Sequence, residues 1–265
     1  MTDVAILSFL QGIAEFLPIS SSGHLVLGKS MLGLGEVGMR LDIFLHVGTL
    51  FAIFAFYRAI VGRLCRAAVG LDGKSALAEA WTYAAKIVLS AIPAGVVGIL
   101  LKDQLETIFA SPKMVGGALM FTGLVLTLTR FLPRGDRDVS FLRALLMGFA
   151  QAVAILPGVS RSGMTLAAAR ASKVNAEKSA EFSFLMSAPP IAGAALLEIL
   201  KALKADGAAT ECLETGWGLC VFGSVVAAVV GYFALKLLVS SLKGRWFWLF
   251  GPYCLAAGLL TLLLV

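Results

Sequence analysis

Long apolar stretches alternate with short polar ones along most of this chain, and the apolar stretches fall into two length groups. A helix that crosses a bilayer needs about 20 mostly apolar residues. Six stretches approach that length and are predicted to be transmembrane helices: residues 41–57, 84–101, 114–132, 182–200, 217–239 and 247–265. Two shorter stretches, residues 4–17 and 141–156, each run into a proline followed by serine and glycine. We predict that these two are re-entrant hairpins, whose irregular backbone has to be buried in protein or line a cavity.

The two short stretches carry the same motif at an offset of 140 residues. Residues 11–23 align with residues 151–163 without a gap, and glutamine, alanine, two serines and glycine coincide. Chance recurrence is the alternative, and the pair Phe44-Leu45, which aligns with Phe184-Leu185 at the same offset, argues against it. Each half then holds one hairpin and three spans, so the second half has to be inverted. We predict a single all-α membrane domain over residues 1–265, with inverted-repeat halves of about 1–132 and 141–265.

Composition and charge agree with a membrane protein and orient it. The chain is 59% hydrophobic and 14% charged, whereas soluble domains are more polar. Apart from Arg161, 6 Lys and Arg residues fall on the side of the N-terminus and 15 on the opposite side, which should therefore be cytoplasmic. The net charge of +6 is explained by these cytoplasmic loops rather than by a nucleic-acid partner. No Lys or Arg precedes the first apolar stretch, so we expect no cleavable signal peptide.

The first hairpin gathers polar side chains that a membrane segment rarely keeps: Gln11, Glu15, Ser20, Ser21, Ser22 and His24. Buried carboxylates and imidazoles are costly in a bilayer and usually functional. Gln11 and Glu15 are four residues apart and share one helix face. Ser20 follows the helix-breaking proline and suits the N-cap of a second short helix, whose free N–H groups favour an anion. Ser21 and His24, three residues apart, are predicted to meet as a nucleophile and its base.

The second hairpin carries a cation at the matching place. Its motif reads Pro157-Gly-Val-Ser-Arg-Ser-Gly-Met-Thr165, and Arg161 occupies the repeat position of Ser21. A guanidinium has a forked geometry that suits phosphate, and inside a membrane it needs an anionic partner. Three hydroxyls can add hydrogen bonds to a phosphate: Ser160, Ser162 and Thr165. Each of them could instead bridge helices or satisfy backbone groups, as serine and threonine often do in membranes.

Together the two hairpin tips offer what phosphoryl transfer needs, because charge neutralisation and positioning carry most of that chemistry. The residues expected to be catalytic are Glu15, Ser21, His24 and Arg161. The groups expected to bind the substrate phosphate are Arg161 and the hydroxyls of Ser20, Ser22, Ser160, Ser162 and Thr165. A divalent cation, Mg²⁺ or Ca²⁺, would fit at Glu15 with help from Gln11. Attack by Ser21 after proton transfer to His24, and attack by water with His24 as base, are both open.

Structural interpretations compete with these roles. Glu15 and Arg161 could form a purely structural ion pair, and His24 could be a structural, hydrogen-bonded histidine. Asp42 and His46 share a face at the start of the first span. There the sequence favours an interfacial Asp42 and a His46 that serves packing rather than catalysis.

The two motifs resemble the signatures of a known family, the bacterial undecaprenyl-diphosphatases of the bacitracin-resistance type. Gln11-x-x-x-Glu15-Phe-Leu-Pro-Ile-Ser-Ser-Ser-Gly-His24 is similar to the first signature and residues 157–165 to the second, and the likeness covers nearly the whole chain. The resemblance implies a hydrolase that removes the terminal phosphate of undecaprenyl diphosphate, a phosphoric anhydride. The product would be the monophosphate lipid carrier of peptidoglycan synthesis. Glu15, Ser21, His24 and Arg161 match the family's functional positions, whereas Gln11 stands where many members carry a second glutamate, which weakens a metal site with two carboxylates.

The resemblance also implies a place in the cell. It suggests the bacterial inner membrane and a site that opens to the outer, periplasmic face, in agreement with the orientation inferred from charge. It further implies a homodimer, for which the residues themselves give no signal. A protein of another class, a transporter or flippase of a polyprenyl phosphate lipid, is the alternative, because inverted repeats are common among transporters. A flippase would need the anion site but no nucleophile and base.

Overall fold

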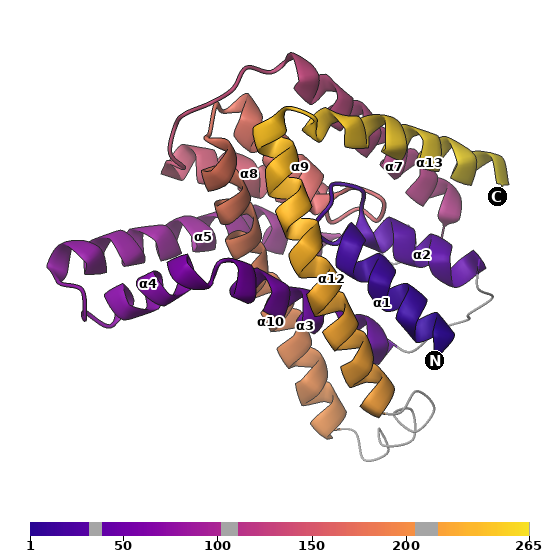
Figure 1. Ribbon diagram of the computed structural model, residues 1–265, viewed down its shortest axis with the longest axis horizontal. Coiled ribbons are helices and arrows are strands. Elements are labelled where there is room, and N and C mark those ends of the chain that lie inside the picture. The colour runs from indigo at the N-terminus through magenta and orange to yellow at the C-terminus, as the bar shows by residue number, and fades with distance from the viewer. Residues whose placement is uncertain (32–38, 102–110, 205–216, 265) are drawn as a thin grey trace.

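The computed structural model describes residues 1–31, 39–101, 111–204 and 217–264, and within these ranges the chain forms helices, short loops and two isolated bridges but no strand. Figure 1 shows their arrangement. The helices, with η for 3₁₀ turns, are α1 (Thr2–Ala14), α2 (Ser21–Met31), α3 (Met39–Phe56), α4 (Arg58–Ala68), α5 (Lys74–Leu100), α7 (Pro112–Leu128), η1 (Thr129–Phe131), α8 (Phe141–Val153), α9 (Arg161–Ala171), α10 (Ala176–Lys204), α12 (Trp217–Gly244), η2 (Phe247–Leu249) and α13 (Phe250–Leu264).

Several helices begin where the sequence supplies a serine as N-cap. The hydroxyls of Ser111, Ser140 and Ser160 each accept a hydrogen bond from the backbone N–H three residues further on, at the starts of α7, α8 and α9. Such a bond satisfies one of the N–H groups that the first turn of a helix leaves unpaired. These serines therefore fix where a helix starts in segments whose apolar residues alone would leave the boundary open.

The predicted all-helical membrane protein is confirmed at the level of helix length and apolar character. In the described part of the chain, four helical stretches are long and apolar enough to cross a bilayer: Lys74–Leu100, Pro112–Phe131, Trp217–Gly244 and Phe247–Leu264. A fifth is added if α3 and α4, which are bent by 80° at Tyr57, count as one span. The predicted span 182–200 lies inside α10, and the two predicted hairpin stretches form the shorter apolar helices α1 and α8.

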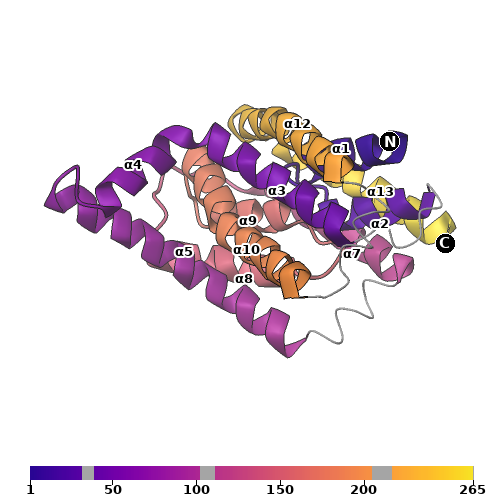
Figure 2. The same ribbon diagram turned by 90° about the horizontal axis from the view of Figure 1, so that it is seen from below.

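The helices pair in a way that follows the repeat. α1 packs against α12, and its counterpart α8 packs against α5; α7 packs against α13, and α3 packs against α10 and α12. Figures 1 and 2 show α7 beside α13, and α4 with α5 as an arm that projects from the rest of the bundle. The close approach of α7 and α13 depends on glycine, because a Cβ at Gly123 would lie 2.8 Å from the carbonyl oxygen of Gly251. Small residues at such crossings are typical of helix packing in membranes.

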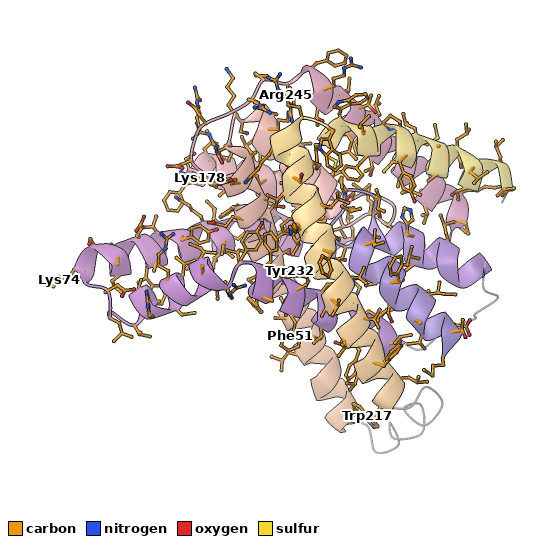
Figure 3. The ribbon with its side chains drawn as sticks, viewed as in Figure 1. Phe51, Lys74, Lys178, Trp217, Tyr232 and Arg245 are labelled. Carbon is orange, nitrogen blue, oxygen red and sulfur yellow. The ribbon has the colours of Figure 1, made fainter. Side chains whose placement is uncertain are left out.

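Apolar side chains both fill the interior and cover the outside. One core cluster includes Phe16, Ile53 and Phe184 and packs around the end of α1. Outward-facing residues such as Phe51 are also apolar, while Lys74, Lys178 and Arg245 lie at or near helix ends (Figure 3). Lipid tails solvate an apolar surface, so this distribution is expected of a multi-pass membrane protein.

Candidate active site

The first hairpin is a helix, a tight turn and a second helix. α1 ends at Ala14 with Glu15 as its C-cap, and the chain turns through Ser20, whose φ of 71° lies in the left-handed region. The Ser20 hydroxyl accepts a hydrogen bond from the N–H of Gly23 at 3.3 Å and lies 3.3 Å from the hydroxyl of Ser22. Ser20 is thus the N-cap of α2, as predicted, and Ser21 is the first residue of that helix.

The second hairpin repeats this turn. α8 ends at Val153, and the Ser160 hydroxyl accepts a hydrogen bond from the N–H of Gly163 at 3.1 Å and lies 3.3 Å from the hydroxyl of Ser162. Arg161 is therefore the first residue of α9, at the place that Ser21 has in α2. Thr122 of α7 holds this turn, because its hydroxyl donates to the carbonyl of Gly158 and accepts from the N–H of Ser160, each at 3.1 Å.

The two tips touch each other. The Ser162 hydroxyl donates to the carbonyl of Leu17 at 3.3 Å. A Cβ at Gly23 would lie 3.2 Å from Gly158, and a Cβ at Gly163 would lie 3.3 Å from Pro18. Positions 18 and 158 are equivalent under the repeat, and so are 23 and 163, so these two contacts are the same contact made twice. The predicted meeting of the hairpin tips is confirmed.

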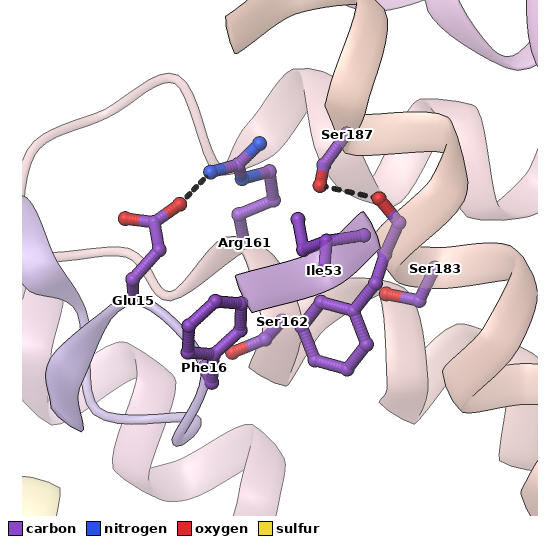
Figure 4. A pocket seen from close by; sticks show the side chains of 8 residues that line it. Glu15, Phe16, Ile53, Arg161, Ser162, Ser183 and Ser187 are labelled. Atoms are coloured by element: carbon purple, nitrogen blue, oxygen red, sulfur yellow. Dashed lines mark hydrogen bonds and ion pairs between the residues drawn. The ribbon is translucent and has the colours of Figure 1, made fainter. Parts of the chain in front are cut away.

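Glu15 is the point at which both hairpins converge. Its Oε2 accepts hydrogen bonds from the Ser21 hydroxyl at 2.7 Å and from Gln11 Nε2 at 3.1 Å. Its Oε1 accepts a hydrogen bond from Arg161 of the second hairpin, which makes a charged pair (Figure 4). Only 3% of the Glu15 side chain is exposed, against 27% of the Arg161 side chain. A buried carboxylate is tolerated when its oxygens are paired in this way.

Two cavities flank this ion pair. The larger has a volume of about 190 Å³ and is lined by residues of both tips and of α3: Ala14, Glu15, Ser20, Ser21, Ser22, His46, Ala154, Ile155, Val159, Ser160 and Arg161. The smaller is about 10 Å³ and is bounded by Phe16, Ile53, Phe184 and the hydroxyls of Ser162, Ser183 and Ser187, in addition to Glu15 and Arg161 (Figure 4). Space for a phosphate therefore exists beside the ion pair, on the side where the serines of the first tip lie.

His24 is placed differently from the prediction. Its Nδ1 lies 2.9 Å from the carbonyl oxygen of Ser20 and its Nε2 lies 2.8 Å from the hydroxyl of Tyr253 in α13. The rings of His24 and Tyr253 also stack, with centroids 5.7 Å apart. In the described part of the chain Ser21 donates to Glu15 instead, so the predicted pair of Ser21 and His24 is not formed. The reason is geometric: the imidazole folds back over its own N-cap, away from the large cavity.

His46 is also placed differently. Sequence reasoning assigned it to packing, but it lines the large cavity, with its Nε2 3.8 Å from Glu15 Oε2. Of the other predicted phosphate-binding residues, Ser20, Ser22 and Ser160 line that cavity and Ser162 lines the small one. Thr165 lines neither, since its hydroxyl donates to the Arg161 carbonyl at 2.8 Å and lies 2.6 Å from that of Ser183.

Sequence reasoning missed His46, Thr122 and Tyr253. The signal for His46 was present, because a histidine within an otherwise apolar span is expensive unless it has a partner. Thr122 and Tyr253 carried no such signal, since their helices reach the tips only through the tertiary fold. As for a metal, no group of three His, Cys, Asp or Glu side chains comes together among residues 1–31, 39–101, 111–204 and 217–264.

Comparison with known proteins matches nearly the whole chain to one family. The model of the family described as "Bacitracin resistance protein BacA" matches residues 4–260. A protein named undecaprenyl-diphosphatase from Desulforapulum autotrophicum is 40% identical, over 97% of this chain and 96% of that protein. Proteins of the same name from Methanosphaera stadtmanae and Bacteroides fragilis are 38% and 34% identical, each over 98% of this chain and 96% of its own length.

Proposed function

The chain belongs to the family of bacitracin resistance protein BacA, and from that premise we propose that it is an undecaprenyl-diphosphate phosphatase. It is a membrane-bound hydrolase of a phosphoric anhydride. Its substrate is a polyprenyl diphosphate lipid, from which it removes the terminal phosphate. The product is the monophosphate lipid carrier used in peptidoglycan synthesis, and recycling of that carrier accounts for the link to bacitracin resistance.

One observation carries the chemical part of the proposal. Glu15 and Arg161, brought together from two hairpins, lie with the Ser21 hydroxyl at the wall of a cavity of about 190 Å³. A purely structural ion pair would need neither the cavity nor the serine hydroxyl. A guanidinium, a carboxylate and a hydroxyl at one point are the groups with which a protein binds a phosphate and transfers it.

The mechanism follows from the contacts of Ser21. Arg161 and the N–H groups at the starts of α2 and α9 bind the diphosphate oxygens. Ser21 transfers its proton to Glu15, with which it is hydrogen-bonded, and its oxygen attacks the terminal phosphorus. The bond from that phosphorus to the bridging oxygen breaks, and the lipid monophosphate leaves. Water then hydrolyses the phosphoserine, which releases orthophosphate and restores the hydroxyl.

His24 takes a different role in this mechanism from the one expected of it. Glu15, rather than His24, is the base for Ser21, because the hydrogen bond of Ser21 goes to the carboxylate. His24 positions the tip through Ser20 and Tyr253. Direct attack by water, with Glu15 as the base, is the second route, and the proton acceptor is the same in both.

A divalent cation, Mg²⁺ or Ca²⁺, remains part of the proposal. Gln11 Oε1 is buried and has no hydrogen-bond partner among the described residues, and it lies on the side chain that contacts Glu15. These two side chains would hold the ion, with the remaining ligands from substrate phosphates and water. When bound, the ion would neutralise charge on the leaving phosphate.

We also propose a membrane topology for the chain. Six transmembrane helices and two re-entrant hairpins form one domain of residues 1–265, with inverted halves 1–132 and 141–265. The equivalent packing of α1 on α12 and of α8 on α5 supports this arrangement. The charge of the loops supports an orientation in which the side of the N-terminus faces outward. The family resemblance supports the inner membrane and a site that opens to the periplasm. The homodimer implied by the family stays a separate prediction.

The direct test is phosphate release from undecaprenyl diphosphate by the purified protein in detergent, with and without a chelator. We expect release with a divalent ion and a large loss with the chelator. Release that is unaffected by the chelator would remove the ion from the mechanism. An absence of release under every metal condition would contradict the phosphatase and favour a flippase of polyprenyl phosphate lipids.

A further inference from the structure

His46 is held with one ring nitrogen facing the large cavity. Its Nδ1 lies 2.7 Å from the carbonyl oxygen of Asp42, one turn earlier in α3. Because a carbonyl can only accept, Nδ1 carries the hydrogen and donates it, which fixes the orientation of the ring. The other nitrogen, Nε2, then faces Glu15, with 3.8 Å between it and Oε2. That distance is longer than a hydrogen bond, so it leaves Nε2 available to a ligand beside Glu15.

The surroundings of His46 are those of a cavity wall. About a third of its side chain is exposed (35%), whereas the neighbouring Leu45 and Thr49 of α3 are fully buried. The cavity that it lines is bounded on its other sides by Ser20–Ser22 and Arg161. A histidine that served only packing would be covered by neighbours as Leu45 is.

His24 differs from His46 in its contacts and its place. Both ring nitrogens of His24 are engaged, one by the Ser20 carbonyl and one by the Tyr253 hydroxyl. His24 does not line the large cavity, whereas His46 does, and among the described residues only its Nδ1 is engaged in a hydrogen bond. Of the two histidines in the chain, His46 is therefore the one that a ligand of the cavity can contact directly.

We propose that His46 contacts the substrate diphosphate through Nε2, in the cavity that Arg161 also lines, and is a substrate-binding residue of this site. Nε2 can accept a hydrogen bond from a protonated phosphate oxygen, while Arg161 donates to the unprotonated ones. α3 thereby supplies a third wall, and the ligand is held between α3 and the two hairpin tips. This inference rests on the proposed function, since it assigns a contact to the same substrate.

The test compares two substitutions that separate hydrogen bonding from packing. His46→Leu keeps the size of the side chain and removes its hydrogen-bonding nitrogens. His46→Gln keeps a hydrogen-bonding group at similar reach. We expect His46→Leu to raise KM for undecaprenyl diphosphate about tenfold, the loss expected for one hydrogen bond to a charged group. His46→Gln should stay within about threefold of the wild type, because it keeps that bond.

A second readout does not depend on turnover. Inorganic pyrophosphate should raise the thermal unfolding midpoint of the wild type and of His46→Gln, and should do so much less for His46→Leu. Phe51→Leu, on the exposed side of α3, is the matched control and should leave both KM and the pyrophosphate effect unchanged.

The outcomes separate this inference from the proposed function. Unchanged KM and pyrophosphate protection in His46→Leu would overturn the contact while Arg161→Ala remains inactive. Wild-type protein that releases no phosphate, or Arg161→Ala that turns over normally, would instead overturn the assignment of the function to this site. The pyrophosphate shift would still decide whether His46 touches a diphosphate.

Discussion

The tips of the two hairpins share a backbone and differ in chemistry. Ser20 and Ser160 cap their helices with the same hydrogen bond, and the glycines at 23 and 163 make the same contact with the opposite tip. At the equivalent sequence positions, however, the residues differ. Glu15 of the first hairpin corresponds to Ile155 of the second, and Ser21 corresponds to Arg161. One copy therefore supplies the acid and the hydroxyl, and the other supplies the cation. Neither tip is a site alone, because the ion pair of Glu15 and Arg161 forms only where the two tips meet.

The same divergence leaves a trace in the second hairpin. Gln11 donates to Glu15, but its counterpart Gln151 has Ile155 four residues later. Within the described residues neither amide atom of the buried Gln151 has a hydrogen-bond partner. An unpaired buried amide is unfavourable. The second hairpin thus holds the equivalent glutamine without a carboxylate one turn later.

The largest expected effect comes from removing the cation of the second tip. Arg161→Ala should lower phosphate release by about 10⁴-fold, since arginine contacts to a transferring phosphoryl group have effects of that order. Because the buried Glu15 would lose its partner, the protein should also unfold more easily. The double variant Glu15→Gln with Arg161→Met removes the unpaired charge. It should be inactive yet regain thermal stability in detergent, and normal turnover by either protein would refute the site.

The next largest effect is expected at Ser21, the residue of the first tip that is equivalent to Arg161 under the repeat. Ser21→Ala should lower the rate by about 10³-fold if the serine attacks phosphorus. A loss of only about tenfold would favour direct attack by water, with Ser21 reduced to a binding group. Rapid quenching and mass spectrometry of the wild type supply the independent measurement, since phosphoserine at position 21 is formed on the first route alone.

The shared backbone can be tested through the two caps. Ser20→Ala and Ser160→Ala should each reduce stability by about 1 kcal/mol, the usual loss when a serine N-cap is removed. We expect the two thermal midpoints in detergent to fall by similar amounts. A marked difference between the two midpoints would mean that the tips share a backbone conformation but that the two N-caps contribute unequally to stability.

The smallest effect is expected at a solvent-exposed ion pair in the second half of the chain. Lys178 pairs with Asp138, just before α8, and this contact lowers the pKa of the Asp138 carboxyl. A lowered pKa in the folded state adds stability above the unfolded pKa of the carboxyl and loses it as the pH falls through the folded value. The pair is exposed to solvent, so Asp138→Asn should change the thermal midpoint only slightly at neutral pH. Below the folded pKa the variant and the wild type should be indistinguishable.

Much of the site was readable from the repeat. The offset of 140 residues placed Arg161 over Ser21 and predicted that the two tips meet, and the position of Ser20 after a proline predicted its cap. The predicted pairing of Ser21 with His24 was wrong. Spacing along a helix shows which side chains can meet, but not which of several possible partners a side chain will hydrogen-bond. Ser21 donates its hydrogen bond to Glu15, which is six residues away in sequence.

The sequence by itself determined that the chain is helical and apolar and that its two halves carry the same motif. It also determined that the first half supplies Glu15 and the second supplies Arg161. These properties depend on residue type and on spacing along the chain, and both can be read directly. Only the tertiary structure decided that His46 lines the cavity and that Tyr253 takes His24. Their helices, α3 and α13, reach the tips through packing between segments far apart in the sequence, and that packing depends on the shapes of many side chains at once.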